Sequence, residues 1–532
     1  MAVTSEDAAS TTRPRAQTEA AGVPGAGRRL TPEAIGIGVV VAIGVVARFV
    51  TSSPLWLDEA LSVNIASLPL GEIPEALRHD GHPPLYYFLL HGWIRLVGDG
   101  DVAVRVLSGL LSVGALGLLG LAARRAAGIR AAWASVVLAA ILPFAVRYGT
   151  EARMYSLVMA LVAGGYLLVR AALASPRPGR LVAVAAVSGG LLLTHYWALW
   201  LVVAVVGVLG WRALRHREGA ERRPTLWVGG AIAAGGVLFV PWLSSLAYQI
   251  GHTGTPWGDA VRPTVIVQVG LVDFGSAVTG TGVAEGGLIG IALALLFVIA
   301  LFGRRLDDHR IVADGRPAPD VRREAVVVGV VIAVAAVASY VTDTTFASRY
   351  LAVVFPLFIL VCGAGLAKLP GRPSRFVVAG VVVCLSLVGV GVNVFLPRTQ
   401  AREVAQAVAD DSRPGDVVVF CPDQLGPAVS RELPEGLDEV VYPSLAGPAL
   451  VDWVDYAERY ESAAPDRVAD EVVARAGADA TVWLVTSTGY KVSHHCDRFA
   501  AALDGRRGAP AAVVAEAQDV FEPAALLRFD PN

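Results

Sequence analysis

Apolar runs of about twenty residues recur along most of this chain and constrain its fold more than any other feature. A run of that length crosses a hydrocarbon core of about 30 Å as a helix. The 532 residues are 55% hydrophobic and only 17% charged, whereas soluble domains are about 25% charged. We therefore predict an α-helical polytopic membrane protein with about eleven transmembrane helices. The predicted spans are 33–52, 103–123, 131–148, 154–173, 180–196, 198–214, 225–245, 284–302, 325–341, 349–367 and 376–396.

Positive charge is distributed unevenly between the loops that connect these spans. Nineteen Arg and Lys residues lie in the connections on one side, and seven lie on the other side. In membrane proteins the cytoplasmic loops carry the excess of Arg and Lys. The asymmetry predicts a multi-pass protein of the cell membrane with a cytoplasmic N-terminus and an extracytoplasmic C-terminus.

Composition divides the chain into three parts. Residues 1–30 are small, polar and interrupted by Pro and Gly, which predicts a disordered cytoplasmic tail. Residues 31–398 form the predicted transmembrane domain, which includes a long outer loop at 53–102. Charge rises in residues 399–532, where strand-like and helix-like segments alternate. That alternation predicts a small extracytoplasmic α/β domain.

Finer patterns place elements within the two outer regions. Segments 61–77 and 85–97 of the outer loop are amphipathic and suit helices that lie at the membrane interface. A second outer segment, 246–283, connects two spans. In the C-terminal region we predict strands at 417–420, 439–442 and 481–486 and helices at 400–411, 454–460 and 467–476.

The four cysteines fall into two pairs. Cys362 and Cys384 lie in apolar spans, where cysteine behaves as a small buried hydrophobic residue. Cys421 and Cys496 both lie in the predicted outer domain, an oxidising setting that suits a disulfide between them. Two histidines precede Cys496, but adjacent side chains diverge and no further ligand cluster is evident, so no zinc site is predicted.

An acidic pair, Asp58 and Glu59, follows the first predicted span. A charge at membrane depth costs roughly 2.5–3.5 kcal/mol, so charge in such a place is a functional hypothesis by default. Asp58 could simply cap a helix, and Glu59 could interact with the helix dipole. Trp56 and Leu57, however, would seat the pair against the membrane, where Asp58 can accept a proton from a hydroxyl as a general base. We favour a catalytic role for Asp58 and Glu59.

Cationic side chains lie at the same predicted face. His82 precedes two prolines and can donate to a phosphate oxygen. Asp101 and Arg105 are four residues apart and could pair with each other, and Arg349 could reach lipid headgroups instead of a ligand. The planar fork of arginine matches phosphate oxygens, so Arg153 and Arg349 are candidates for binding a phosphate group.

Two short connections between spans are unusually polar. Segment 147–155 contains one Glu, two Arg and two Tyr, more than a turn requires, so we expect at least one of them to face a cavity. Segment 194–197 contains His195, although an aromatic belt alone would explain its Tyr and Trp. The candidate donor-binding residues are therefore His82, Arg105, Glu151, Arg153, Tyr155, His195, Arg349 and Tyr350.

Several classes of function have no sequence support. The chain has no Walker loop, no GxGxxG motif and no zinc signature. The net charge is −2, and no basic tract is present. We therefore predict no nucleic-acid partner and no tightly bound metal ion.

As a set, these residues resemble the GT-C glycosyltransferase superfamily. The resemblance is strongest to the bacterial glycosyltransferases grouped with protein O-mannosyltransferases and the lipid A aminoarabinose transferase. It covers roughly residues 33–400 and leaves out the outer domain. The matching features are the Asp58-Glu59 pair, segment 82–85, the acid-xxx-Arg spacing of Asp101 and Arg105, and segment 151–155.

The resemblance implies an inverting transferase that moves a sugar from a polyprenyl-phosphate donor to a cell-envelope acceptor on the outer face of the membrane. Asp58 would activate the acceptor hydroxyl, and Arg153, Arg349 and His82 would neutralise the departing phosphate. Family frequency favours mannose first and arabinose or another pentose second. A lipoglycan, a wall polysaccharide or a protein could be the acceptor. Some relatives use a divalent cation, Mg²⁺ or Mn²⁺, but a third carboxylate for it is not identifiable here.

A flippase or transporter of lipid-linked sugars is the alternative interpretation. Such proteins are also polytopic and contain buried charge, but they commonly show internal repeats and binding sites at the bilayer midplane. The sequence shows no repeat, and its charges gather at one face. We therefore favour the transferase.

Overall fold

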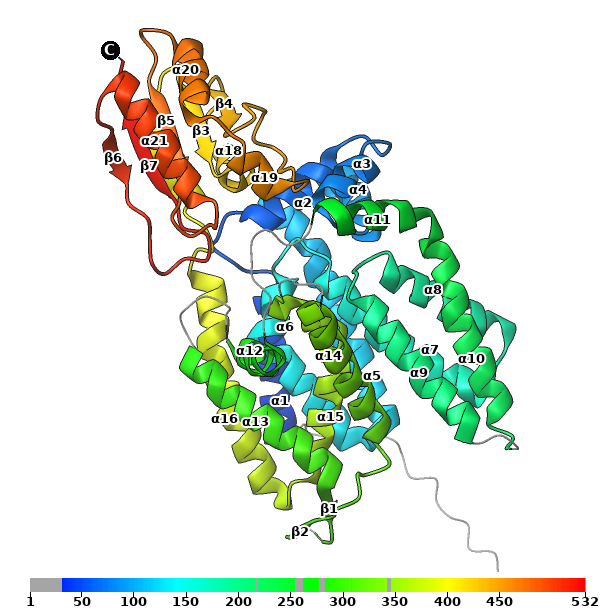
Figure 1. Ribbon diagram of the computed structural model, residues 1–532. Coiled ribbons are helices and arrows are strands. Elements are labelled where there is room, and N and C mark those ends of the chain that lie inside the picture. The colour runs from blue at the N-terminus through cyan, green and yellow to red at the C-terminus, as the bar shows by residue number, and fades with distance from the viewer. Residues whose placement is uncertain are drawn as a thin grey trace, which may run out of the picture.

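The computed structural model describes residues 31–215, 219–253, 262–276, 283–307, 309–341 and 346–531. The predicted tail at 1–30 lies outside the described residues. Figure 1 shows a long helical bundle with an α/β region at one end.

The bundle consists of apolar helices. Seven helices in the described part of the chain are long and apolar enough to cross a membrane. Many of their large apolar side chains are exposed, as expected for a surface that faces lipid. The predicted α-helical, multi-pass membrane architecture is confirmed. The helices of the bundle are α1 (Pro32–Ala47), α5 (Asp101–Ile141), α7 (Tyr155–Ala174), α8 (Pro178–Leu192), α9 (Ala198–Arg215), α10 (Arg222–Gly235), α13 (Val283–Phe302), α14 (Arg322–Val341), α15 (Phe355–Lys368) and α16 (Gly371–Phe395).

Some helix boundaries differ from the predicted spans. α5 is broken at Gly128, whose backbone angles (φ 87°, ψ −179°) are not helical and suit a residue without Cβ, so the predicted spans 103–123 and 131–148 are two helices that meet at this glycine. The second of these spans is shorter than predicted, because a separate helix, α6 (Pro143–Gly149), begins at a proline. α10 continues through η1 (Gly236–Trp242) into α11 (Leu243–His252), and α12 (Pro263–Gly275) is a helix that the sequence did not predict.

Glycines on α15 let its neighbours approach closely. A Cβ at Gly363 would lie 2.0 Å from Ser135 Oγ on α5, and one at Gly365 would lie 1.9 Å from the Leu296 carbonyl oxygen on α13. Small residues at such contacts are typical of membrane helix packing. α15 is thereby fixed in the centre of the bundle, with α5 and α13 against it.

Three short helices cover the end of the bundle next to the α/β region (Figure 1). They are α2 (Leu57–Ser67), α3 (Ile73–Asp80) and α4 (Leu85–Val97). The prediction of a helix over the whole of 61–77 is wrong. Helix α2 ends at Ser67 and α3 begins at Ile73, and Pro69 lies in the connection between them. The prediction of a helix at 85–97 is confirmed. We call this end of the molecule the Asp58 end.

The C-terminal region forms a five-stranded mixed sheet in the order β4-β3-β5-β7-β6. The contacts of β3 with β4 and β5 are parallel, and those of β7 with β5 and β6 are antiparallel. The predicted α/β region is confirmed. The strands are β3 (Val417–Cys421), β4 (Asp438–Val441), β5 (Val482–Thr486), β6 (Ala511–Val514) and β7 (Ala525–Phe529), and the helices include α17 (Ala401–Asp411), α18 (Gly426–Ser430), α19 (Tyr456–Glu461), α20 (Pro465–Ala476) and α21 (Ser493–Arg507).

A disulfide ties this sheet to a helix. Cys421 at the end of β3 is bonded to Cys496 on α21, with their Cα atoms 5.5 Å apart. Neither α21 nor the strands β6 and β7 was predicted from sequence. The disulfide therefore holds α21, which the sequence did not predict, against the end of β3.

A cavity of about 1230 Å³ lies between α7, α8, α9, α10 and α14. The side chains that line it are mostly apolar. Among them are Leu191 and Leu201, which lie four residues before and six residues after His195 in sequence. Arg212 and Arg322 line its other end, near the hairpin side of the molecule. That hairpin, β1 (Gly303–Arg305) with β2 (Ile311–Ala313), lies at the end opposite Asp58 (Figure 1).

Candidate active site

The first turn of α2 positions Asp58. The residue before the helix, Trp56, has no side-chain oxygen with which to cap it. Asp58 does not cap the helix either, because it is the second helical residue and its side chain points to the arginines described below. Instead, the backbone N–H of Leu57 donates to Glu522 of the C-terminal region at 3.1 Å. The carboxylate of Asp58 is therefore available for other partners.

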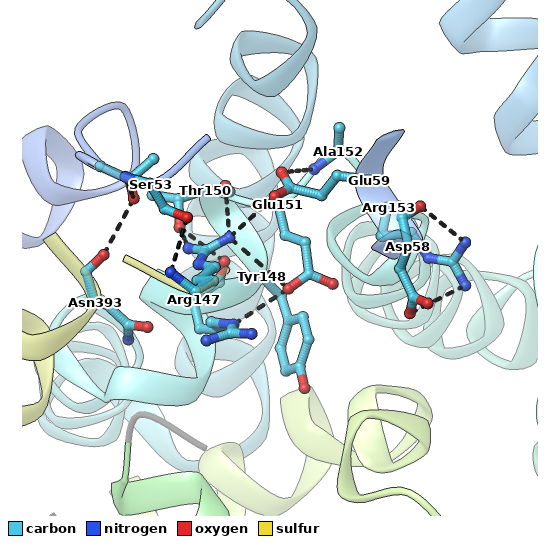
Figure 2. Close-up of polar contacts among 12 residues, drawn as sticks. Ser53, Asp58, Glu59, Arg147, Tyr148, Thr150, Glu151, Ala152, Arg153 and Asn393 are labelled. Carbon is cyan, nitrogen blue, oxygen red and sulfur yellow. Dashed lines mark hydrogen bonds and ion pairs between the residues drawn. The ribbon is translucent and has the colours of Figure 1, made fainter. Parts of the chain in front are cut away.

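Two arginines converge on one oxygen of Asp58. Arg349 Nη1 lies 3.2 Å from Asp58 Oδ2, and Arg153 Nη2 lies 3.7 Å from the same atom. The side chains of Asp58 and Arg349 are 16% and 17% exposed, whereas that of Arg153 is 3% exposed. Arg349 also lies over the ring of Trp56, 5.8 Å from its centroid, which helps to orient the guanidinium. Figure 2 shows Arg153 facing Asp58.

Arg153 is anchored by a chain of hydrogen bonds. Its Nη1 donates to Ser62 Oγ at 2.9 Å, and its Nη2 lies 3.0 Å from His82 Nε2. With Arg153 as the donor, His82 accepts through Nε2 and donates through Nδ1 to Asp80, 2.8 Å away. The hydroxyl of Tyr87 donates to the same Asp80 oxygen at 3.1 Å. Arg153 and His82 thus share one anchored network beside Asp58.

Unsatisfied polar atoms surround this network. Within the described part of the chain, the buried atoms Tyr155 Oη, Trp56 Nε1 and Arg153 Nε have no hydrogen-bond partner. Buried donors without partners are costly, and each such group calls for an explanation. Three unused donors near two guanidinium groups suit a ligand rich in oxygen atoms.

Aromatic rings lie next to these donors. The ring of His195 lies 5.8 Å from that of Tyr155 and 5.3 Å from that of Tyr350, which follows Arg349 on η2 (Ser348–Val353). The Nδ1 of His195 accepts from the backbone N–H of Trp197 at 3.1 Å.

Glu59 belongs to a different cluster. It is fully buried and receives two hydrogen bonds from Arg105, at 2.7 and 2.6 Å. The backbone N–H of Ala152 donates to it at 3.0 Å, and Arg398 lies 3.5 Å away. Burial alone would raise the pKa of Glu59, but these cations and hydrogen bonds outweigh burial and hold the pKa below its usual value. Glu59 and Arg105 therefore bind each other and not the residues around Asp58.

Glu151 extends this second cluster. Arg147 Nε donates to its Oε2 at 3.2 Å, and Arg398 lies 4.0 Å from the same atom. Figure 2 shows the Glu151–Arg147 pair on the other side of Glu59 from the Asp58–Arg153 pair. Asp101, which the sequence suggested as a partner of Arg105, instead lies 3.8 Å from Arg431 of the C-terminal region. We call Glu59, Arg105, Arg147, Glu151 and Arg398 the Glu59 cluster.

The structure therefore brings some predicted residues together and separates others. Most of the predicted donor-binding residues lie around Asp58 or directly behind its neighbours. They are His82, Arg153, Tyr155, Arg349 and Tyr350, with His195 behind the two tyrosines. Arg105 and Glu151 lie elsewhere, in the Glu59 cluster, together with Glu59 itself.

Sequence reasoning missed three side chains of this region. Arg398 follows the last predicted span and could have been recognised as a charge at the end of that span. Asp80, which holds His82, lies within the polar segment before it. Glu522 offers no signal, because its partner is 465 residues away.

No carboxylate-rich metal site is found among the described residues. They contain no group of three or more His, Cys, Asp or Glu side chains able to hold one ion. Asp58 is instead surrounded by guanidinium groups. The residues present therefore do not fit the Mg²⁺ or Mn²⁺ site that the resemblance left open, and no step below is assigned to a metal.

The arrangement of helices matches that of a solved structure. ArnT from Cupriavidus metallidurans in the apo state aligns over 94% of this chain and 98% of its own, with a TM-score of 0.58 and 14% identity. The same protein bound to undecaprenyl phosphate aligns over 93% and 98%, with a TM-score of 0.55 and 15% identity. The chain has the GT-C fold. The predicted resemblance to the GT-C superfamily is thereby confirmed.

Sequence comparison supports the same assignment over part of the chain. Residues 81–244 match the family model described as dolichyl-phosphate-mannose-protein mannosyltransferase. No curated protein matches the chain. The matched GT-C segment contains His82, Arg105, Glu151, Arg153, Tyr155 and His195.

Proposed function

We propose that this protein is an inverting glycosyltransferase that moves a sugar from a polyprenyl-phosphate donor to an acceptor of the cell envelope. The observation that carries the proposal is the convergence of Arg349 and Arg153 on Asp58, at 3.2 and 3.7 Å. A carboxylate and a phosphate repel each other unless cations lie between them. This arrangement provides both a base and the cations that keep a phosphate next to it.

The phosphate of the donor would bind to the two guanidinium groups, and His82, whose ring nitrogens contact Arg153 and Asp80, would hold Arg153 in place. Arginine offers phosphate a planar set of donors, and the unused donors of Tyr155 and Arg153 point to additional oxygen atoms of the ligand. The cavity lined by Leu191 would hold the polyprenyl chain, because its walls are mostly hydrophobic and Leu191 lies four residues before His195 in sequence.

The proposed reaction is a single displacement. The acceptor oxygen attacks the anomeric carbon and forms the new glycosidic bond, while the bond between that carbon and the phosphate oxygen breaks on the opposite face. Asp58 takes the proton of the acceptor hydroxyl. Negative charge grows on the departing polyprenyl phosphate, so cations fixed beforehand stabilise the transition state more than the ground state.

The comparisons support the donor class and leave the sugar and the acceptor open. ArnT, whose fold this chain shares, was solved with undecaprenyl phosphate bound, and the matching family model is described as a mannosyltransferase. We propose mannose first and arabinose or another pentose second. The acceptor is a lipoglycan, a wall polysaccharide or a protein.

We further propose that the Asp58 end is the extracytoplasmic face and that residues 399–532 form a separate domain there. The disulfide between Cys421 and Cys496 supports an oxidising compartment for that region. The excess of Arg in the loops at the opposite end supports the same orientation.

The direct test is to incubate purified protein in membranes with a panel of radiolabelled polyprenyl-phosphate sugars and envelope acceptors. The wild type should transfer one sugar of the panel. Asp58→Asn should transfer none, while Asp101→Asn, an acid at the same end that pairs with Arg431, should behave as the wild type. Lack of transfer from every donor, or full activity of the Asp58→Asn variant, would refute the proposal.

A further inference from the structure

The helix that carries Asp58 is capped by a residue from the far end of the chain. The first backbone N–H groups of a helix have no partner within the helix and need an acceptor outside it. Trp56 cannot supply one. Glu522 Oε1 accepts from the N–H of Leu57 at 3.1 Å, directly before Asp58.

Glu522 is held in place by the segment that enters the α/β region. Its backbone N–H donates to the Arg398 carbonyl at 2.8 Å, and its carbonyl accepts from the Gln400 N–H at 3.2 Å. The side-chain oxygen of Gln400 accepts from the N–H groups of Ala517 and Ala524, at 2.8 and 2.9 Å. The loop that carries Glu522 is thus fixed on both sides of it, and it cannot move without breaking several hydrogen bonds.

The neighbouring residue contacts the same turn of α2. The ring of Phe521 packs edge-on against Trp56 with centroids 4.9 Å apart. Arg147 of the Glu59 cluster lies over the ring of Phe521, 5.7 Å from its centroid. Residues 521 and 522 therefore contact both the residue before α2 and its first N–H group.

The Glu522 carboxyl is almost completely buried, with 3% of the residue exposed. Burial, with a smaller contribution from the charge of Asp58, raises its pKa to about 8 against hydrogen bonds from Thr399, Leu57 and Tyr490. Burying a carboxyl costs free energy, and an apolar contact such as that of Phe521 would hold the two regions together without that cost. Its position at the helix that carries Asp58 suggests a more specific role.

We infer that Glu522 is a positioning residue for Asp58: by capping α2 from the C-terminal region, it holds the first turn so that Asp58 faces Arg153 and Arg349. The C-terminal region is thereby a part of the reaction centre and not only a neighbour of it. This inference rests on the proposed transferase activity. It assigns to Glu522 no contact with the substrate.

The test uses the full chain in membranes and three variants. Glu522→Ala removes the cap, Glu522→Gln retains an oxygen that can accept from Leu57, and Glu516→Gln is the control. Glu516 lies in the same region, but its carboxyl accepts from Ser487 and Thr488 instead of α2. For each variant, kcat and the KM for the donor are measured on the folded fraction.

We expect Glu522→Ala to lower kcat about 10- to 100-fold with the donor KM changed less than about threefold, because misplacing a catalytic group by 1 Å can cost about 100-fold. Glu522→Gln should recover most of the lost rate, and the control should match the wild type. If the alanine variant does not fold, Glu522→Asp, which withdraws the carboxyl by one methylene, should show the same selective loss of kcat.

Two results overturn the inference. In one, Glu522→Ala or Glu522→Asp retains wild-type kcat. In the other, Glu522→Gln loses as much rate as the alanine variant. These outcomes are distinct from failure of the proposed function, in which the wild type itself transfers no sugar.

Discussion

Asp58 and Glu59 are neighbours in sequence, yet they lie in opposite kinds of environment. Glu59 is fully buried, and Arg105, Arg398 and a backbone N–H occupy its oxygens. Asp58 is partly exposed, and its contacts with Arg349 and Arg153 are longer, at 3.2 and 3.7 Å. One carboxylate has its hydrogen-bonding capacity filled by the protein. The other retains capacity for a ligand.

The difference teaches how to separate structural charge from reactive charge in a membrane protein. Both residues cost free energy to place near lipid, so the cost alone does not distinguish them. They differ in the source of their hydrogen-bond partners. Those of Glu59 come from the protein, whereas Asp58 retains capacity for a ligand. The predictions below test that distinction, from the largest expected effect to the smallest.

The largest effect on stability should follow from breaking the Glu59 cluster. Arg105→Met leaves the buried carboxylate of Glu59 with Arg398 as its remaining cation. Removing one partner of a buried pair costs about 3–5 kcal/mol. We expect a clear fall in the melting temperature of the purified protein. Arg170→Met, at a half-exposed arginine 3.8 Å from Glu324, is the matched control and should cost less than about 1 kcal/mol. Equal melting temperatures of the two variants would contradict the structural role of Arg105.

The next effect concerns Arg153. Arg153→Ala should lower kcat/KM for the donor about 10- to 100-fold, because hydrogen bonds to charged groups contribute about 1.5–3 kcal/mol. The KM for the acceptor should change far less, since the guanidinium is proposed to bind the phosphate. Steady-state kinetics with each substrate varied in turn measures both values. Equal losses for donor and acceptor would count against the phosphate role.

Arg349→Lys should have a smaller effect than loss of the arginine. Lysine keeps the charge but lacks the planar fork and the broad contact with the Trp56 ring. A loss of about one hydrogen bond, roughly 1 kcal/mol, would lower donor kcat/KM about threefold to tenfold. A lysine variant as inactive as Arg349→Ala would show that geometry, and not charge, decides binding here.

The last effect should appear gradually, in the pH dependence of stability, where one group changes the free energy of unfolding by at most about 1.4 kcal/mol per pH unit. Burial raises the pKa of Glu522 from near 4.5 to about 8. The folded protein therefore holds this proton over a range in which the unfolded chain releases it. Stability from this group is complete below pH 4.5 and is lost as pH rises toward 8.

Thermal melts from about pH 5 to about pH 8.5 test this linkage. The wild type should lose more stability over the range than Glu522→Gln, whose amide does not titrate, while the charged neighbour Asp58 and the phenol of Tyr490 are unchanged in both. Parallel curves for the two proteins would contradict the burial effect.

Much of the fold could be predicted from local patterns. Long apolar runs place the helices of the bundle, and short strand-like segments that alternate with helix-like ones place β3, β4 and β5. α21, β6 and β7 were missed because their sequences are short or mixed, and tertiary contacts decide their structure. The break of α5 at Gly128 agrees with the predicted connection between spans 103–123 and 131–148, which Arg124, Arg125 and Arg130 indicated.

The candidate site could be predicted only in part, for a related reason. Charge at the ends of spans pointed to Asp58, Arg153 and Arg349, which the structure brings together. The partner of each charge depends on three-dimensional packing, so the sequence could not show that Arg105 binds Glu59 and not a ligand. Nor could it show that Glu522 caps α2.

The most direct test measures sugar transfer and melting temperature for Asp58→Asn and Glu59→Gln side by side. We predict that Asp58→Asn loses about 10²- to 10⁴-fold in transfer rate, as expected for a general base, with the melting temperature unchanged. We predict that Glu59→Gln loses stability, while its folded fraction still transfers sugar. An active Asp58→Asn variant, or a Glu59→Gln variant that is stable but inactive, would contradict the assignment of the reactive carboxylate to Asp58.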